Sequence, residues 1–241
     1  MIDAAFAGNR LLRTFPAELR QSIGNEIKLE RLDAGDTVLR RGTDVDSSVF
    51  PFDTTMISLI IDLDDARSVE VASIGREGAV GGIVSCGHAP AFSRAMVTVA
   101  GPALRVPMAI IEQAKSGSGH LRNLFCRYSD YLLAQIMQTA ACNSFHPIEA
   151  RAARWLLTAQ DRAGDKLALT QEALAGLLGV QRTTVNAGAR ELQDRGLITT
   201  RRGTIAVVDR DGLKAMSCEC YDRVEQFFGD IVGDSGSGRA D

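Results

Sequence analysis

The sequence predicts an α+β chain, with an antiparallel β domain first, one long helix next and a small, mainly helical domain last. Three observations predict this order. Short apolar runs separated by Gly, Asp and Pro fill residues 27–112, with a turn signal about every ten residues. Apolar residues then recur at spacings of three and four, without Gly or Pro, over residues 120–142. Helical patterns resume at Ile148, beyond a proline.

The length and composition indicate a soluble globular chain. Its 241 residues suit two domains of ordinary size, each with its own core. No apolar run approaches the roughly 20 residues that span a bilayer, and the N-terminus lacks the pattern of a secretory signal. We therefore expect a cytoplasmic protein that makes no contact with a membrane. The five cysteines are odd in number and widely scattered, so they are interpreted as reduced thiols: Cys86, Cys126, Cys142, Cys218 and Cys220.

Residues 1–119 are expected to form the β domain. Stretches such as "IKLERLDAGDTVLRRG" and "SSVFPFDTTMISLIIDLDDARSVEVASIG" are rich in β-branched residues and are broken by turn residues. This spacing is typical of an antiparallel barrel or sandwich.

Residues 120–145 are expected to form one long helix. Its apolar stripe is narrow and close to heptad spacing, which suits packing against the same helix of a second copy. The alternative is that the stripe packs on the chain's own barrel. The candidate dimer-interface residues are Leu121, Leu124, Phe125, Tyr128, Leu132 and Ile136.

The boundary to the last domain, residues 146–232, is expected at His146-Pro147, because a proline disfavours helical conformation in the residue before it. Within this domain, apolar and polar residues alternate in "LITTRRGTIAVVD", and a turn is expected at Arg202-Gly203, as in a small hairpin. The final residues, 233–241, have the composition of a disordered tail.

The stretch "LTQEALAGLLGVQRTTVNAGARELQDRGLI" has the outline of a helix-turn-helix. Thr170 can cap the first helix, and Gly179 suits a sharp turn. On a helical wheel the second helix, from Gln181 to Asp194, has an inward apolar stripe of Val185, Ala189 and Leu192. Gly188 lies near this stripe and is interpreted as permitting close approach to the helix of residues 170–178.

The opposite face of this second helix carries hydrogen-bond donors and small side chains, and no Asp or Glu. Residues 151–202 hold nine Lys and Arg against five Asp and Glu, although the whole chain has a net charge of −3. Arg and Asn can pair with guanine and adenine edges in a major groove, so the candidate base contacts are Arg182, Thr183 and Asn186. Candidate phosphate contacts lie on both helices and on the hairpin wing: Thr170, Gln171, Thr184, Arg190, Arg201 and Arg202. An ordinary helical hairpin with a solvated face is the alternative.

The order of elements, with this stretch in place, resembles the Crp/Fnr family of bacterial transcription regulators. "AGDTVLRRGTDVDSSVFPF" looks like the opening of that family's barrel, and "AACNSFHPIEARAARWLL" looks like its hinge and first DNA-domain helix. The chain also resembles a branch that shares "VEVASIGREGAVGG" and a late "CEC". The resemblance implies a jelly-roll barrel like a cyclic-nucleotide-binding domain, a long dimerisation helix and a winged helix-turn-helix. It implies a homodimer with an effector in the barrel and two recognition helices on a palindromic operator, and leaves RNA polymerase open as a further partner.

The family's cyclic-nucleotide site is incomplete in this sequence. Gly82 stands where nucleotide-binding members have the ribose-binding Glu, and Ser93 stands where they have the phosphate-binding Arg. Arg94 is displaced by one position, which in a strand points it to the opposite face. With Gly81, these residues are the candidate effector pocket, and we expect no response to cAMP because a buried phosphate would lack its cation. We also expect no iron–sulphur cluster of the family's N-terminal type, because no cysteine precedes Cys86.

No other group of residues predicts a metal site, a cofactor or catalysis. Cys218 and Cys220 fall on an expected helix, where an i, i+2 pair points about 200° apart, so packing is the interpretation and metal or redox sensing the alternative. Cys86-Gly-His88 has no further nearby ligand, and the three histidines are too dispersed for a cupin-type metal centre. We therefore expect no enzyme.

Two hypotheses from different classes remain. The first is a homodimeric, sequence-specific regulator that binds double-stranded DNA. The second is a small-molecule-binding barrel whose C-terminal helices bind another protein. The positive charge of residues 151–202 favours the first.

Overall fold

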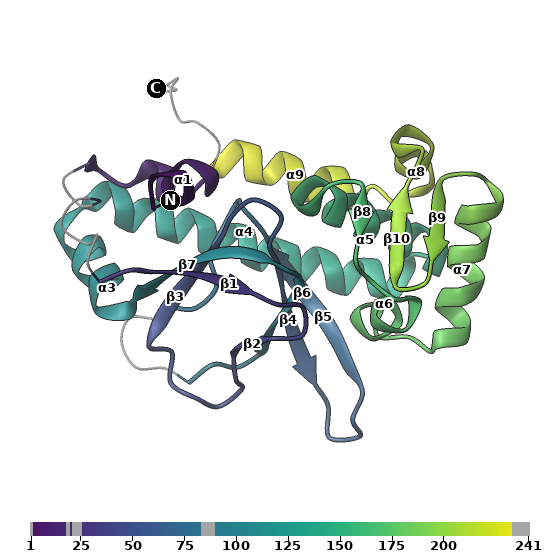
Figure 1. Cartoon of the computed structure of the whole chain (residues 1–241), viewed down its shortest axis with the longest axis horizontal. Helices are drawn as coiled ribbons and strands as arrows, with labels where there is room; N and C mark the ends of the chain where they lie inside the picture. Colours follow the sequence, from purple (N-terminus) through teal and green to yellow (C-terminus); the bar gives the residue numbers. More distant parts are fainter. Residues whose placement is uncertain (1, 18–19, 21–25, 83–89, 233–241) are drawn as a thin grey trace.

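The computed structural model describes residues 2–17, 20, 26–82 and 90–232. A β domain and a smaller helical domain lie side by side along one long helix, α4 (Gly119–Phe145), as Figure 1 shows. The last helix, α9 (Cys220–Ile231), packs along α4. The expected disordered tail at 233–241 lies outside the described residues. Among the described helices, none has the length and apolarity needed to cross a bilayer.

The β domain is a jelly-roll-like pair of antiparallel sheets, as expected, but the sheets do not close into a barrel. One sheet has the strand order β1-β7-β3 and the other has the order β2-β6-β4-β5. The bounds are β1 (Lys28–Leu32), β2 (Thr37–Leu39), β3 (Ser47–Pro51), β4 (Met56–Asp62), β5 (Ser68–Ile74), β6 (Arg94–Val99) and β7 (Gly101–Pro107). Apolar side chains from both sheets share one core, which includes the fully buried Phe50, Ile57 and Leu104.

The N-terminal segment closes one end of this core. It consists of α1 (Ile2–Gly8) and the short 3-10 helix η1 (Leu12–Thr14), and α3 (Met108–Gly117) follows the last strand of the jelly roll. The ring of Phe15 lies 6.2 Å from that of Phe50 and 6.3 Å from that of Phe125 on α4, measured between centroids. These aromatic contacts join the segment, the sheets and the long helix.

The long helix begins and ends where the sequence predicts. The Ser118 side chain accepts a hydrogen bond from the Leu121 amide and so caps the first turn. The helix stops at Phe145, because His146 precedes Pro147 and adopts an extended conformation with φ −104° and ψ 143°.

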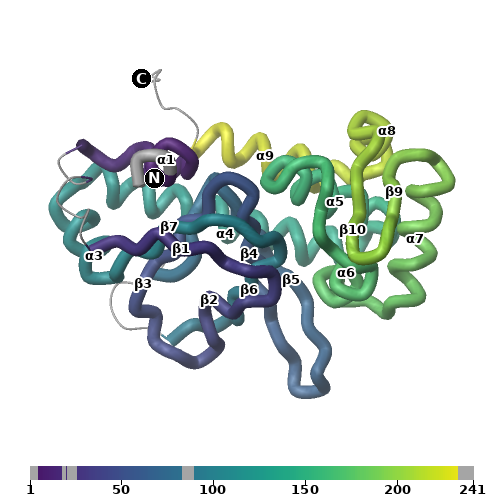
Figure 2. The backbone as a smooth tube through the Cα atoms, viewed as in Figure 1, coloured from purple at the N-terminus to yellow at the C-terminus, as the bar shows by residue number. Residues whose placement is uncertain are grey.

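The C-terminal domain contains the expected helix-turn-helix and wing. Its elements are α5 (Ile148–Ala163), β8 (Lys166–Leu167), α6 (Gln171–Leu178), α7 (Arg182–Asp194), β9 (Ile198–Arg201), β10 (Thr204–Val207) and α8 (Arg210–Met216). Strands β9 and β10 pair around Arg202-Gly203, as predicted for the hairpin, and β8 completes a sheet of order β8-β10-β9. The tube in Figure 2 shows this domain at the opposite end of α4 from α1.

The two expected cores are not fully separate. The core of the C-terminal domain includes three buried residues of the β domain, Met56, Ile60 and Val99. Helix α6 also packs against β5, where a Cβ added to Gly179 would lie 2.9 Å from a methyl carbon of Val69. The two domains therefore share an apolar contact in this structure.

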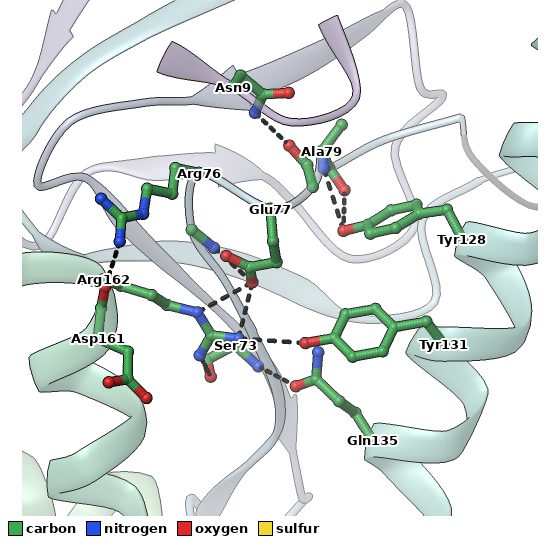
Figure 3. A network of polar contacts seen from close by, with 12 residues as sticks. Asn9, Ser73, Arg76, Glu77, Ala79, Tyr128, Tyr131, Gln135, Asp161 and Arg162 are labelled. Atoms are coloured by element: carbon green, nitrogen blue, oxygen red, sulfur yellow. Dashed lines mark hydrogen bonds and ion pairs between the residues drawn. The ribbon is translucent and has the colours of Figure 1, made fainter. Parts of the chain in front are cut away.

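A buried polar network also fixes α5 to the β domain (Figure 3). Arg162, at the C-terminal end of α5, pairs with Glu77 in the turn after β5 at 2.7 Å, and both side chains are less than a tenth exposed. The same guanidinium donates to Ser73 Oγ at 2.6 Å and to the Tyr131 hydroxyl of α4 at 3.4 Å. Burial alone would lower the pKa of Arg162, but the Glu77 carboxylate raises it overall. Arg162 is therefore held in its charged form at the junction of three elements.

The turn after β5 is shaped to admit this arginine. A Cβ on Gly75 would lie 2.7 Å from the Cδ and Cγ atoms of Arg162, so a side chain at that position would displace it. The Gly75 amide donates to Glu77 Oε1 at 3.0 Å and orients the carboxylate. The glycine thus leaves room for the guanidinium stem and helps to hold its partner.

A second carboxylate of β5 also receives a donor from α5. The indole Nε1 of Trp155 donates to Glu70 Oε1 at 2.8 Å, and Ser58 on β4 donates to the other carboxylate oxygen. Burial raises the pKa of Glu70, whereas the two hydrogen bonds lower it by less. The α5 face toward the sheet therefore carries two specific polar attachments.

We expect Arg162→Met to lower the free energy of unfolding of the full chain by about 3–5 kcal/mol, because it leaves a buried Glu77 charge without a partner. Replacing both partners with Met should restore most of this loss, since no charge is then buried. Urea denaturation followed by tryptophan fluorescence at the α5 interface measures both effects.

The control is Arg195→Met, which removes an exposed i, i+4 pair with Glu191 at 3.0 Å. Exposed pairs contribute less than about 1 kcal/mol. Equal losses for Arg162→Met and Arg195→Met would contradict a stabilising role for the buried pair.

Candidate DNA-binding face and effector cavity

The first helix of the helix-turn-helix has the predicted caps. The Thr170 side chain accepts a hydrogen bond from the Ala173 amide at 3.0 Å, which satisfies one of the free donors at the start of α6. Gly179 ends α6 in the left-handed conformation, with φ 65° and ψ 34°. A residue with a side chain is strained in that conformation, so glycine permits the tight turn into α7.

The inward face of α7 is as predicted from the helical wheel. Val185, Ala189 and Leu192 are all buried at 1% exposure or less. Gly188 is also buried, but the atoms nearest to an added Cβ belong to Ile148 and its neighbour on α5, not to the helix of residues 170–178. The interpretation of Gly188 was therefore wrong about its partner, because the wheel gives a direction but not the element that lies there.

The outward face of α7 lies at the edge of the molecule, on the side away from the β domain (Figure 1). Arg182 and Thr183 are exposed, and the Arg182 guanidinium lies 3.8 Å from the Glu172 carboxylate of α6. Asn186 is half-buried, and its Oδ1 is buried without a hydrogen-bond partner in the described part of the chain. The three candidate base-contact residues therefore all lie in the N-terminal part of α7.

The candidate phosphate contacts surround this face. Thr184 and Arg190 are exposed on α7, and Arg201 and Arg202 are exposed at the tip of the wing. At the start of α6, Thr170 is exposed and Gln171 is half-buried.

Thr170 also lines a cavity of about 390 Å³ between α6 and the β domain. A phosphate bound at the start of α6 would therefore lie on the side of the helix-turn-helix that faces the β domain.

The β domain contains a cavity of about 310 Å³ at the predicted effector position. Gly81, Gly82 and Ser93 line it, together with Leu132 of α4. Its described lining includes no charged side chain and consists mainly of aliphatic residues: Leu39, Val45, Leu59, Ile74, Ala79, Val80, Pro90, Ala91 and Phe92 complete it. Residues 83–89 are not among the described ones.

Arg94 does not belong to this cavity, which corrects the predicted pocket. Its guanidinium forms two hydrogen bonds with the Asp62 carboxylate on β4, at 2.9 Å and 2.8 Å. These bonds and the arginine charge lower the pKa of Asp62 despite some desolvation. Adjacent strand residues point to opposite faces, so Ser93 faces the cavity and Arg94 faces away, as the sequence register indicated.

The buried stripe of α4 corrects the predicted dimer interface. Five of the six candidates, Leu121, Leu124, Phe125, Tyr128 and Leu132, are at most 7% exposed and pack into the chain's own β-domain core. The alternative, packing on the own barrel, is the observed one. The most apolar stripe of α4 packs on the β domain of the same chain, because this contact removes the largest apolar area from water.

A second apolar face of α4 remains exposed. Leu133 is 53% exposed, Met137 is 58% exposed, and Ile136, the sixth candidate, is 38% exposed. Ala140 and Ala141 are exposed on the next turn. This Leu133–Ala141 face, rather than the buried stripe, is the part of the helix that is free to contact another molecule.

The late cysteine pair is not on one helix, which corrects a further expectation. Helix α8 ends at Met216 and α9 begins at Cys220, so Cys218 lies in the connection between them. Both thiols lie beside Cys142 and His146 at the end of α4. The available signal was the i, i+4 spacing of Cys142 and His146, but no local pattern links these two residues to the later pair. The Cys86–His88 pair lies outside the described residues.

Comparison with known proteins agrees with this architecture. Residues 150–216 match the model of the Crp-like helix-turn-helix domain. No curated protein sequence matches the chain. Among solved structures, FixK2 from Bradyrhizobium japonicum superposes with a TM-score of 0.68 at 14% identity, covering 80% of this chain and 98% of that one.

Two other structures show the same fold. The c-di-GMP-responsive global regulator CLP from Xanthomonas campestris has a TM-score of 0.63 at 16% identity and covers 80% of this chain and 99% of its own. A CRP-family transcriptional regulator from Thermus thermophilus has a TM-score of 0.64 at 16% identity, with 78% and 96% covered. Residues 150–216 are therefore a Crp-like helix-turn-helix domain, and the chain as a whole has the fold of the Crp/Fnr transcription regulators.

Proposed function

We propose that the protein is a sequence-specific transcription regulator that binds a palindromic operator as a homodimer and does not respond to cAMP. The outward face of α7 is the observation that carries this proposal. Arg182 and Thr183 are exposed at the start of a helix whose opposite side is buried in the domain core. A helix held in this way can enter a major groove without unfolding any part of its domain.

The surrounding charge supports DNA rather than a protein as the ligand of α7. Arg190 on the helix and Arg201 and Arg202 on the wing are exposed where the two DNA backbones would flank the groove. In the described structure, the acids near this face are partly neutralised: Glu172 lies beside Arg182, and Glu191 pairs with Arg195. Binding of another protein by these helices is the second candidate, and no observed apolar patch on α7 favours it.

The exposed Leu133–Ala141 face of α4 supports the homodimer. Exposed Leu and Met side chains on successive turns cost free energy in water and suit packing of two copies of the helix. A two-fold axis parallel to α4 would place the two α7 helices at the same end of the dimer, as a palindrome requires. RNA polymerase is a further proposed partner, since regulation at a promoter involves it.

The cavity supports an effector other than cAMP. A cyclic phosphate buried there would need a cation, and the described lining offers none. Arg94, which directly follows the lining residue Ser93 in the sequence, pairs with Asp62 on the other face of the sheet. The aliphatic lining suits an apolar or neutral ligand. We propose no catalysis, and a cytoplasmic location follows from the proposed DNA target.

We expect Arg182→Ala to weaken binding to the operator by about 1–3 kcal/mol and to relax the preference at one base step in each half-site. The operator is first obtained by recovering bound fragments from the genome of the source organism. It should be a palindrome with half-sites about one helical turn apart. Fluorescence anisotropy with operator and mismatched duplexes, repeated over a range of salt concentrations, measures affinity, discrimination and phosphate contacts.

The matched control is Arg195→Ala, which removes a positive charge from the C-terminal end of α7, where it pairs with Glu191. This variant should keep the discrimination between operator and mismatched duplexes. Full discrimination by Arg182→Ala, or no dependence of binding on salt, would refute the role of α7 in reading DNA.

We expect the double substitution Leu133→Asp with Met137→Asp to convert the dimer into monomers, because it would bury four charges between two copies of α4. Sedimentation velocity measures the change. Gln226→Asp on the exposed side of α9 adds charge without touching this face and should leave the dimer intact. A wild-type monomer at micromolar concentration would contradict the proposed assembly.

We expect isothermal titration calorimetry to detect no cAMP binding with a dissociation constant below about 1 μM, since loss of a buried cation costs several kcal/mol. Ser93→Arg restores the family's cation toward the cavity and should increase any measurable affinity. Tight cAMP binding by the unchanged protein would contradict the proposed effector class.

A further inference from the structure

The end of α4 and the start of α9 bring together three thiols and one imidazole. Cys142 lies in the last turn of α4, and His146 is its C-cap. Cys218 lies between α8 and α9, and Cys220 is the first residue of α9. One potential ligand atom from each of the four residues lies within 4.8 Å of the other three. Residues 76 positions apart in sequence are thus gathered around one point.

The distances fit the edges of a tetrahedron around one ion. Cys142 Sγ lies 3.6 Å from Cys218 Sγ, and Cys220 Sγ lies 3.5 Å from His146 Nδ1. Zinc bonds of about 2.3 Å to sulphur and about 2.0 Å to nitrogen imply tetrahedral edges of about 3.8 Å between two sulphurs and about 3.5 Å between sulphur and nitrogen. The observed edges are close to both values. The ligands of an iron–sulphur cluster are spread over two or more irons, so this compact arrangement suits a single ion.

The imidazole is oriented as a metal ligand would be. While Nδ1 faces the thiol of Cys220, Nε2 lies 3.2 Å from the Glu219 carboxylate. A metal-bound histidine commonly donates its other ring N–H to a carboxylate, which fixes the tautomer. In addition, Gln138 Nε2 donates to Cys220 Sγ at 3.0 Å, as a second-layer donor to a thiolate would.

The surroundings carry positive charge that suits a negatively charged centre. Three thiolates and one neutral imidazole around a divalent ion have a net charge of −1. The guanidiniums of Arg151 and Arg154 on α5 interact electrostatically with Cys142. The Nε atoms of both arginines are buried without a hydrogen-bond partner in the described structure. A centre of net negative charge would compensate these two cations, of which Arg151 is buried and Arg154 half-buried.

We propose that Cys142, His146, Cys218 and Cys220 bind one Zn²⁺ ion. All four ligands come from the protein, and the three cysteines are at most 7% exposed, so the site is closed and structural in type. The ion joins the start of α9 to the end of α4, beside the Pro147 hinge that leads into α5. This site goes beyond the proposed function and does not depend on DNA binding.

The first test measures metal in the full-length protein, purified without chelators and without oxygen. Mass spectrometry of the elements should find about one zinc per chain. Cys142→Ser and Cys218→Ser should each lose most of it. The matched control is Cys126→Ser, which removes an exposed thiol from the same helix and should keep the zinc. His146→Cys should also keep it, because four thiolates still bind zinc.

The second test does not depend on the folding of the variants. The metal is removed from the wild-type protein, and Co²⁺ is added as a spectroscopic probe. We expect the absorption of tetrahedral cobalt with thiolate charge-transfer bands, at one equivalent per chain, and its loss when Zn²⁺ is added. The proposal is overturned if the purified protein holds less than about a tenth of an equivalent of metal and takes up no cobalt at thiolates. A Cys142–Cys218 disulfide in the oxygen-free protein would also overturn it.

Discussion

The buried ion pair between Arg162 and Glu77 is the central polar attachment of the C-terminal domain to the β domain. Helix α5 carries Arg162 at one end and packs against α7, so an attachment of α5 is also an attachment of α7. In a buried environment neither charge is tolerated alone, which makes the attachment specific in position and direction.

The stretch "VEVASIGREG" contains most of the β-domain side of this attachment. Glu70 accepts from Trp155, Gly75 makes room for the arginine stem, and Glu77 pairs with it. The same stretch also lines the proposed effector cavity: Ser73 binds Arg162 on one face of β5, while Ile74 faces the cavity on the other. Alternation along a strand therefore places the cavity wall and the α5 attachment on neighbouring residues. A ligand that displaces Ile74 acts directly on the strand that holds the DNA-binding domain.

The sequence predicted the features that depend on local patterns. The stop of α4 before Pro147, the cap at Thr170, the turn at Gly179 and the buried side of α7 follow from neighbouring residues, and the structure confirms each. The features that the sequence did not predict depend on which distant part of the chain, or which second molecule, packs against a given face. Periodicity identified the apolar stripe of α4 but could not say whether its own β domain or a second copy covers it.

Local patterns also could not identify the partners of individual side chains at the cavity and at the end of α4. The register predicted that Arg94 leaves the cavity, yet only the fold shows that Asp62 receives it. The cysteines appeared as scattered thiols because the chain between Cys142 and Cys218 forms almost the whole C-terminal domain. A continuous helix through Cys218 would point the thiols of Cys218 and Cys220 in different directions. The break between α8 and α9 brings them together.

Helix α4 has consecutive residues with different neighbours: Leu132 lines the proposed effector cavity, and Leu133 lies on the exposed face. In the proposed dimer, one helix thickness separates each cavity from the other subunit. If the α4–α4 contact differs between the empty and the filled state of a cavity, the effector affinity of the second cavity depends on whether the first is filled. Linkage requires this dependence to be mutual, so the two subunits would respond to their effector cooperatively rather than independently.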